Sequence, residues 1–455
     1  MSDKLVIFDE VQHKVLKIRI YPNQDQTILI NKTFGSCRKL YNEHLQERNE
    51  FYIDNILPIP KEERQLKSKE IYKKFKPKTE KEWKIIYPYM KEISSAALQQ
   101  ARMDCDQAFV NFFKSNNSSR KGKSGFPRFK SKHNNHQSYR EVNTNNNCSL
   151  NFEERKVKIP KIGKVSFKDR KFPTWWDRKT KLCSMTIEKS CSNQYFVAIL
   201  FEVQKAVHKI DNRKDAIGMD FSPAEMYINS DGLSGKDFGY VAQKQAHHKQ
   251  LKKLSKRLAR KQKGSNNRNK ARIKLARLEE HIANSRKDWI EKESLRLVRS
   301  YDKVVVEDLN LKGISKFLRN AKNMNDTSWA TFVSRLQAKG EDYNCEVIKA
   351  DRYFPSSKLC SCCGWKYENL TLDIRKWTCP KCGTSHIRDV NAAINLKNYV
   401  PMEGRELTPV ESDKVKSLAL LALQVGSLNE AGNHSQATSG RNVLGLYPRA
   451  GFKWR

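Results

Sequence analysis

The chain has 455 residues, of which 87 are lysine or arginine and 50 are aspartate or glutamate, so its formal charge is +37 at neutral pH. Hydrophobic residues make up 38% of the chain, which is enough for two to four cores and excludes a wholly disordered protein. No stretch approaches the roughly eighteen consecutive apolar residues of a membrane span, so we expect no membrane partner.

The positive charge indicates a polyanionic partner, and nucleic acid is the common one. The alternative is a basic surface that only confers solubility.

The N-terminus lacks the basic region and apolar core of a signal peptide. Five of the eleven cysteines lie between Cys360 and Cys382. This grouping favours a metal site in a reducing compartment over a disulfide framework, so we expect a cytoplasmic, nucleoid-associated protein of a prokaryote.

The N-terminal half is predicted to contain a strand, two clear helices and then a set of strands. Residues 15–22 alternate like a strand, while 25–52 and 95–113 have apolar residues at helical spacing. Short alternating runs between residues 126 and 203 predict a small β-barrel or sandwich, which the first strand could join. A polar linker is predicted over residues 206–214.

The C-terminal half is predicted to contain four short strands and a basic helix pair. The strands are 216–220, 226–229, which would form a hairpin with the first, 303–307 and 346–349. Residues 252–277 hold twelve lysines and arginines and no acid, with a break at Gly264 between two helices. We interpret this helix pair as a phosphate-binding surface, although a solvated helical face is the usual explanation of a charge run. Its candidate contacts are Lys252, Lys253, Lys256, Arg257, Arg260, Lys261, Arg268 and Lys270.

The aromatic and basic residues of the segment 126–130 have two possible roles. The rings of Phe126 and Phe129 could stack on unpaired bases, or they could fill the predicted barrel.

Two cysteine pairs of the form C-x2-C predict a structural zinc site. Cys360 and Cys363 form the first pair, and Cys379 and Cys382 form the second. Four thiolates in this spacing suit one tetrahedral Zn²⁺ ion, and such a closed site is not catalytic. A redox-active dithiol pair is the weaker alternative. Cys362 is then the spare thiol.

Three acids stand at the ends of predicted elements. Asp220 and Glu307 each end a short strand, and Asp389 opens a helix that follows the cysteines. Two adjacent strand ends and a helix start can converge, in the order of an RNase H-like core. Three carboxylates there suit two Mg²⁺ ions, which hydrolyse phosphodiesters. Taken singly, each acid has an ordinary explanation as a turn, strand-end or helix-cap residue.

Several motifs resemble the TnpB family of transposon-associated RNA-guided nucleases, which are related to compact type V CRISPR effectors. The resemblance covers roughly residues 13–400. The motifs are KIRIYPN (17–23), FGSCRKLYN (34–42), LQQA (98–101), GFPRFKSK (125–132), GMDFS (218–222), VVVEDL (304–309), DRYFPSSKLCSCCG (351–364), WTCPKCG (377–383) and RDVNAAIN (388–395).

The resemblance implies a multidomain protein of mixed α+β and α/β class, with an RNase H-like (RuvC) nuclease core, an inserted zinc ribbon, a wedge β-barrel and a helical recognition lobe. The implied divisions are 1–30 for the first wedge strand, 31–125 for the recognition lobe, 126–205 for the wedge barrel, 206–214 for the linker, 215–350 for the nuclease core with the helix pair 245–300, 351–386 for the zinc ribbon, 387–425 for the last nuclease segment and 426–455 for a disordered tail.

The resemblance also implies the activity. Family members bind a guide RNA, recognise a short motif beside the target, and cut double-stranded DNA that pairs with the guide. Asp220, Glu307 and Asp389 would be the catalytic, Mg²⁺-binding residues. Further nucleic-acid contacts are implied at Arg388 and, for the short motif, at Ser95, Gln99 and Gln100, although the last three could be ordinary helix-surface residues.

Three other functions are compatible with the sequence. A compact type V CRISPR effector would use the same chemistry. A guide-directed DNA-binding regulator would have lost cleavage, and a guide-free zinc-ribbon protein would bind DNA alone. Two departures from the family pattern bear on activity, since many relatives have glycine after the first acid, where this chain has Phe221, and aspartate where it has Ile387.

Overall fold

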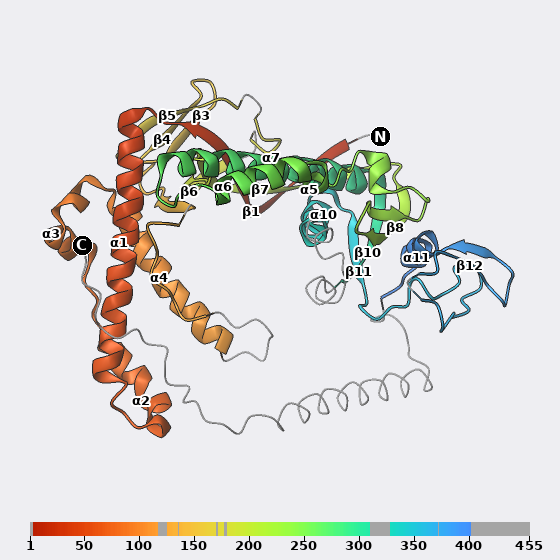
Figure 1. Ribbon diagram of the computed structural model, residues 1–455, viewed down its shortest axis with the longest axis horizontal. Coiled ribbons are helices and arrows are strands. Elements are labelled where there is room, and N and C mark those ends of the chain that lie inside the picture. The colour runs from red at the N-terminus through yellow and green to blue at the C-terminus, as the bar shows by residue number, and fades with distance from the viewer. Residues whose placement is uncertain are drawn as a thin grey trace. The chain divides into compact units, whose positions relative to one another are not determined.

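Figure 1 shows the computed structural model. It describes residues 3–116, 125–134, 136–169, 172–176, 180–309, 328–371 and 373–401. The predicted tail 426–455 and most of the last predicted segment, 387–425, lie outside the described residues. No helix among these ranges is long and apolar enough to cross a membrane.

Seven strands form one antiparallel sheet, in the order β2-β6-β7-β1-β5-β4-β3. Their bounds are β1 Asp3–Tyr21, β2 Gln137–Val142, β3 Ser149–Asn151, β4 Lys156–Ile159, β5 Gly163–Phe167, β6 Thr180–Lys189 and β7 Tyr195–Ile210. The predicted strands between 126 and 203 are therefore confirmed, and the first strand joins them by pairing with β7 and β5.

The prediction of a closed barrel is wrong. Within the described chain the edge strands β2 and β3 do not pair with each other, so the sheet is open. Helices α1 and α4 pack against β2. At the other side, the described part of the hairpin β4–β5 pairs with β1 at Ile20 and Tyr21.

The predicted linker 206–214 is also mostly strand. β7 continues to Ile210 because its residues 206–210 pair with Asp3–Ile7 of β1 beyond an irregularity in the register. Only residues 211–213 connect β7 to the next strand. This stretch is polar because it lies in an exposed two-stranded ribbon. Antiparallel strands need apolar side chains on one face only.

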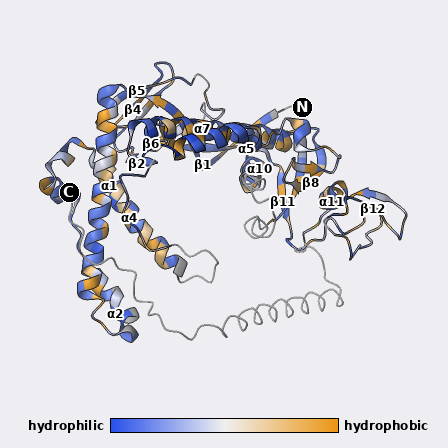
Figure 2. Cartoon of the chain, viewed as in Figure 1, coloured by the Kyte–Doolittle hydropathy of each residue, from blue (hydrophilic) through white to orange (hydrophobic). Residues whose placement is uncertain are grey.

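Helices occupy most of the described chain between β1 and β2. They are α1 Gln24–Asn55, α2 Lys61–Lys73, α3 Glu80–Ile86, the short helix η1 Pro88–Glu92 and α4 Ser95–Asn116. The predicted helices 25–52 and 95–113 are confirmed as α1 and α4. Asn23 caps α1 with its side chain, in a reciprocal capping box with Gln26. Along α4, hydrophobic and hydrophilic residues are interspersed (Figure 2), as expected for a helix with one buried face.

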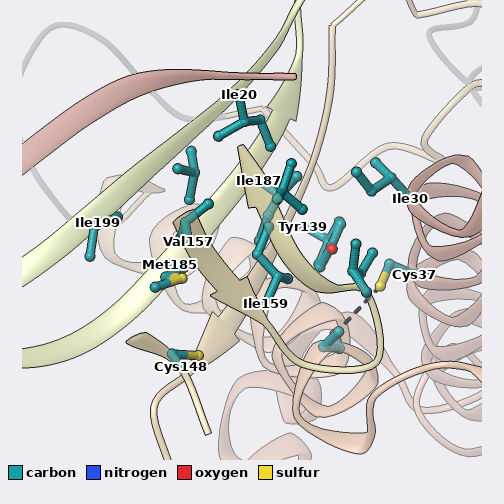
Figure 3. Close-up of a cluster of buried hydrophobic side chains, with 14 of the residues drawn as sticks. Ile20, Ile30, Cys37, Tyr139, Cys148, Val157, Ile159, Met185, Ile187 and Ile199 are labelled. Carbon is teal, nitrogen blue, oxygen red and sulfur yellow. Dashed lines mark hydrogen bonds between the residues drawn. The ribbon is translucent and has the colours of Figure 1, made fainter. Parts of the chain in front are cut away.

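The helices and the sheet share one hydrophobic core (Figure 3). Ile20 from β1, Ile30 from α1 and Ile187 from β6 are almost completely buried in it. Tyr139 of β2 packs edge-on against Phe34 of α1, with ring centroids 5.5 Å apart. This core fixes α1 and α4 against the edge of the sheet.

A second sheet has four strands in the order β11-β10-β8-β9. They are β8 Lys214–Ser222, β9 Met226–Asn229, β10 Tyr301–Glu307 and β11 Glu346–Ala350, so all four predicted strands are confirmed. β8, β10 and β11 are parallel, and β9 forms the predicted antiparallel hairpin with β8. Helices α7 Asn266–Ser300, α10 Trp329–Tyr343 and α11 Arg388–Lys397 pack on these strands.

The basic helix pair is formed by α6 His248–Ala259 and α7, with the short helices η2 Gly235–Phe238 and α5 Gln243–Ala246 before it. The helices α6 and α7 run antiparallel, since the ring of His247 lies beside that of His281 while Arg268 reaches the carbonyl of Leu258. The described part of the cysteine-rich region contains the two-stranded ribbon β12 Lys376–Thr378 and β13 Ser385–Ile387.

Candidate functional site

Two of the three predicted acids lie side by side at the carboxyl ends of neighbouring strands. Met219 of β8 is paired with Val306 of β10, so Asp220 and Glu307 follow at the same level. The strand residues before them are completely buried, which explains why apolar runs end in these acids. The two half-buried carboxyl groups hydrogen-bond to each other. The structure therefore brings together the first two acids as predicted.

The third acid, Asp389, lies in the first turn of α11. This helix crosses β8 so closely that a Cβ atom on Gly218 would lie 2.0 Å from the carbonyl oxygen of Ala393 and 2.4 Å from the amide nitrogen of Lys397. Glycine is therefore required at position 218. The close crossing brings Asp389 near enough to Asp220 and Glu307 for its charge to raise the pKa of both.

Burial and charge repulsion both raise the pKa values of Asp220 and Glu307 in this carboxylate site. Burial, and then the negative charge of Glu307, holds the pKa of Asp220 well above its usual range. Burial also raises the pKa of Glu307, against the effect of Ser356, whose hydroxyl donates to Glu307 Oε1 at 2.8 Å. Among the described residues no lysine or arginine forms an ion pair with either acid. Arg388 offsets part of the negative charge at Asp220 but does not pair with it, and oxygen donors with this remaining charge fit a divalent cation.

Asp389 differs from the other two acids because it forms ion pairs with two arginines. Arg388 Nη2 lies 2.8 Å from Asp389 Oδ1, and Arg375 Nη1 lies 3.1 Å from Oδ2. The four cysteines, by contrast, are the only group in the described chain whose potential ligand atoms all lie within 4.8 Å of one another. The three carboxylates are thus neighbours without forming so tight a cluster.

Arg375 was not predicted from the sequence. It directly precedes β12, and its carbonyl accepts a hydrogen bond of 2.9 Å from the backbone N–H of Arg388. The register of the ribbon, in which Trp377 faces His386, places Arg375 opposite the start of α11. An alternating pattern on both sides of the second cysteine pair was the signal that could have revealed this ribbon and its arginine.

The four predicted cysteines form the expected cluster. Cys360 Sγ lies 3.6 Å from Cys382 Sγ, and Cys363 Sγ lies 3.6 Å from Cys379 Sγ. Each pair is closed by a glycine with positive φ, Gly364 or Gly383, whose N–H donates to the carbonyl of the first cysteine. Cys362 is exposed and outside the cluster. These four thiols can hold one metal ion.

The sequence did not predict that His386 lies against this cluster. Its Nε2 atom is 3.1 Å from Cys360 Sγ, and its ring packs against that of Trp377.

Asparagines of α11 connect the cysteine cluster to the carboxylate site. Asn391 donates to the carbonyl of Leu359 at 2.6 Å, directly before the first cysteine. Asn395 donates to the carbonyl of Ser356 at 2.7 Å, and the hydroxyl of Ser356 contacts Glu307. The first cysteine loop is therefore fixed to the same helix that carries Asp389.

The predicted nucleic-acid contacts have different surroundings. Most are exposed on α6 or the first turns of α7, and none of these forms an ion pair in the described chain; they are Lys252, Lys253, Lys256, Arg257, Arg260 and Lys270. Lys261 is half-buried. Arg268 donates to the carbonyls of Leu258 and Lys261, so it caps the end of α6.

Of the remaining predicted contacts, Arg388 is the first residue of α11 and is paired with Asp389, and the other three lie on α4. Ser95 and Gln99 are exposed, and Gln100 is half-buried. The hydroxyl of Ser95 accepts a hydrogen bond of 2.7 Å from Lys84 Nζ.

The two departures from the family pattern have ordinary surroundings. Phe221 packs against Trp329, with ring centroids 5.2 Å apart, and belongs to the core of the second sheet. Ile387 is 54% exposed in β13 and is not part of a core.

Three family models match the chain. They are described as a helix-turn-helix domain, over residues 12–55, a probable transposase, over residues 198–318, and a Cas12f1-like TNB domain, over residues 329–396. The first covers the end of β1 and α1.

Curated relatives match most of the chain. A putative RNA-guided DNA endonuclease of Streptomyces pristinaespiralis is 30% identical over 383 residues, covering 84% of this chain and 88% of that protein. The putative RNA-guided DNA endonuclease InsQ of Escherichia coli K12 is 26% identical, covering 84% and 91%. A solved Cas12f1–sgRNA–target DNA complex matches at 13% identity and a TM-score of 0.48, covering 85% of this chain and 99% of that one.

The extent of the match to the Streptomyces protein decides the family, because it covers 84% of this chain and 88% of that protein at 30% identity. The chain belongs to the TnpB family of transposon-associated RNA-guided nucleases.

Proposed function

We propose that this protein is an RNA-guided DNA endonuclease that hydrolyses DNA at Asp220, Glu307 and Asp389. The observation that carries the proposal is the pair of adjacent acids near the ends of β8 and β10, with Asp389 beside them and, among the described residues, no lysine or arginine in an ion pair with either of the first two. A family relationship that covers most of the chain supports it. RuvC-like cleavage of a target paired with the guide is the activity we infer.

The three carboxylates would hold two Mg²⁺ ions. When bound, such ions activate a water molecule and stabilise the leaving oxygen of the phosphodiester. The chain's own residues prepare the site. Ser356 orients Glu307 through its hydroxyl, and the crossing at Gly218 sets the approach of Asp389. Asp220 has to lose its proton before it can act as a ligand.

Arg375 and Arg388 have a second role in this proposal. Both neutralise Asp389 in the structure, and the side chain of Arg375 is 66% exposed. A guanidinium group binds phosphate as readily as carboxylate. Arg375 can therefore exchange Asp389 for the phosphate of the strand being cut, which frees the carboxylate as a ligand.

The cysteine cluster would hold one structural Zn²⁺ ion. Four thiolates leave no open coordination position, so this ion takes no part in hydrolysis. Its function is to fix the ribbon that carries Arg375 and the loop that carries Ser356.

The nucleic-acid partners would be a guide RNA and double-stranded target DNA. Pairing with the guide reads the sequence, while the protein binds the backbones and a short motif next to the target. The exposed basic face of α6 suits phosphate contacts, and Ser95, Gln99 and Gln100 are the candidate motif contacts. The same chemistry would serve a compact CRISPR effector.

The test compares Asp220→Asn with Asp215→Asn in the full chain, purified with the RNA it retains. Asp215 is an exposed acid at the start of the same strand, so its variant controls for the loss of one charge. Asp220→Asn should abolish cleavage of a target that matches the guide, while Asp215→Asn should cut normally. Cleavage by Asp220→Asn at the wild-type rate would contradict the assignment. Guided binding without cleavage by the wild-type protein would indicate a regulator instead.

A further inference from the structure

The segment that connects α4 to β2 exposes aromatic rings in a strongly basic stretch. Residues 107–140 contain eight lysines and arginines and no acid. Phe126 is 50% and Phe129 is 53% exposed. Neither ring belongs to the core of the sheet, so they do not fill a barrel. Large exposed aromatic residues beside cations need a partner to account for them.

The backbone of Lys130, next to Phe129, is fixed to α1. The side chain of Asn42 on α1 hydrogen-bonds both the N–H of Lys130, at 2.8 Å, and its carbonyl, at 3.0 Å. The Lys130 ammonium lies 4.0 Å from the ring centroid of Tyr41. Phe126 packs edge-on against Phe109 and Phe112 of α4, at 5.5 and 5.4 Å between centroids. Phe126 is therefore anchored on α4, and the chain next to Phe129 is anchored on α1.

A cavity of about 230 Å³ lies directly beside Lys130, between α1, α4 and β2. Its polar lining is mostly cationic or amide, from Arg38, Lys130, Asn134, Gln137, Ser138 and Arg140. In the described chain neither Arg38 nor Arg140 has a carboxylate partner. The one acid of the lining, Asp104, lies 3.6 Å from Lys130 Nζ, which offsets its charge.

The size and charge of the cavity define its ligand. It is smaller than the roughly 300–1,000 Å³ typical of pockets for drug-sized molecules, so it suits a single phosphate or sugar-phosphate group. Two unpaired guanidinium groups are the preferred partners of a phosphate. Hydroxyl and amide side chains next to them suit a ribose 2′-hydroxyl, which can both donate and accept.

We propose that Phe126 and Phe129 stack on unpaired bases of RNA and that the neighbouring cavity binds a phosphate of the same strand. Only unpaired bases offer their faces to protein rings, and stacking is a general mode of single-strand binding. This inference rests on the proposed function, which supplies RNA as a constitutive partner. The site is separate from the predicted motif contacts, because α4 turns Ala97 and Ala101 into the cavity while Ser95 and Gln99 lie on its exposed side.

The experiment measures binding of a fluorescent twelve-nucleotide oligouridylate to the full-length protein in EDTA, with the matching deoxyuridine oligomer in parallel. Phe129→Ala should weaken RNA binding at least about fivefold, the lower end of what losing one base–aromatic stack costs. Phe129→Leu, which keeps the bulk, should do the same. Phe8→Ala, an aromatic residue 40% exposed on β1, is the matched control and should bind normally.

Arg140→Gln should weaken binding and reduce the slope of log Kd against log salt by about one contact. Oligouridylate carrying 4-thiouridine should crosslink to the peptide that contains Phe126 and Phe129. The inference is overturned if both Phe129 variants bind RNA like Phe8→Ala, or if no crosslink maps to this peptide. It is also overturned if the deoxyuridine oligomer binds the wild-type protein as tightly as RNA does and the Phe129 variants lose as much affinity for it as for RNA.

Guided cleavage separates this inference from the proposed function. If wild-type protein with its own RNA cuts a matched target and the Phe129 variants bind RNA normally, the stacking site is wrong and the endonuclease assignment stands. If wild-type protein does not cut but Phe129→Ala weakens RNA binding, the endonuclease assignment is wrong and the stacking site stands.

Discussion

The cysteine cluster and the carboxylate site are both joined to α11, through Asn391 and Asp389 respectively, but they are built in opposite ways. The cysteine cluster comes from two adjacent loops within residues 360–382, and its four sulfur atoms all lie within 4.8 Å. The carboxylate site comes from β8, β10 and α11. In the described chain no lysine or arginine forms an ion pair with Asp220 or Glu307, and Asp389 is paired with the exposed Arg375 and the mostly buried Arg388. A closed site of soft ligands stabilises the fold, whereas an open site of repelling hard ligands is available for chemistry.

The largest effect is expected from a variant that disables the carboxylate site and leaves the cysteine cluster intact. Glu307→Gln should reduce guided cleavage by roughly a thousandfold or more, since losing a metal ligand removes several kcal/mol of transition-state stabilisation. The zinc content should stay at one ion per chain. Single-turnover cleavage and metal analysis of the same preparation measure both. A loss of zinc in this variant would mean that the two sites do not form independently.

The reverse experiment is Cys379→Ser. Zinc content should fall from one ion to none, the melting temperature should drop, and cleavage should fall as well, because Arg375 and Ser356 lose their support. Cys362→Ser is the control, since Cys362 is exposed outside the cluster. Normal zinc content in Cys379→Ser would show that the ligand set is wrong.

Arg375 tests the contact between the two regions. Arg375→Ala should slow guided cleavage by about 10- to 100-fold, which is the range expected from losing one charge-assisted contact in the transition state. Arg375→Lys should recover only part of the rate, because lysine lacks the bidentate geometry. Zinc content and melting temperature should not change, given that the side chain is 66% exposed. An unchanged cleavage rate would leave Arg375 with a structural role only.

Gly218→Ala tests the packing that joins α11 to the sheet. The added Cβ would meet backbone atoms of α11 at 2.0 and 2.4 Å, so the helix has to shift. We expect a loss of about 1–3 kcal/mol in the free energy of unfolding, as for other overpacked positions, together with slower cleavage. Gly232→Ala, at an open turn position with positive φ, provides a comparison in which backbone strain is the only cost. Denaturant unfolding measures both.

The smallest expected effect is a pH dependence of stability without metal. The pKa of Asp220 is raised in the folded protein, so folding takes up a proton there and this acid favours the folded state at low pH. Its contribution is lost as pH rises above the usual range of an aspartate. In EDTA, the melting temperature of wild-type protein relative to Asp220→Asn should therefore fall between pH 5 and pH 8, and Mg²⁺ should remove the difference. A constant difference would contradict the carboxylate repulsion.

Elements that depend on local spacing were predicted well from the sequence. The strand that ends in Asp220, the strand that ends in Glu307 and the helix that starts near Asp389 were all found from apolar runs bounded by polar residues. The closed barrel and the linker 206–214 were wrong because both depend on which strands meet. Alternation predicts a strand but does not tell whether its edge pairs with β3 or is covered by α4.

The sequence by itself determined the four cysteines, the three acids and the basic charge, because residue type and short spacing encode ligand chemistry directly. Only the tertiary structure decided what surrounds them. It placed Arg375 and Arg388 on Asp389, Ser356 on Glu307 and Phe129 at the surface beside a cationic cavity. These contacts join residues from separate elements, and their energies come from burial, charge and hydrogen bonding that exist only once the chain has packed.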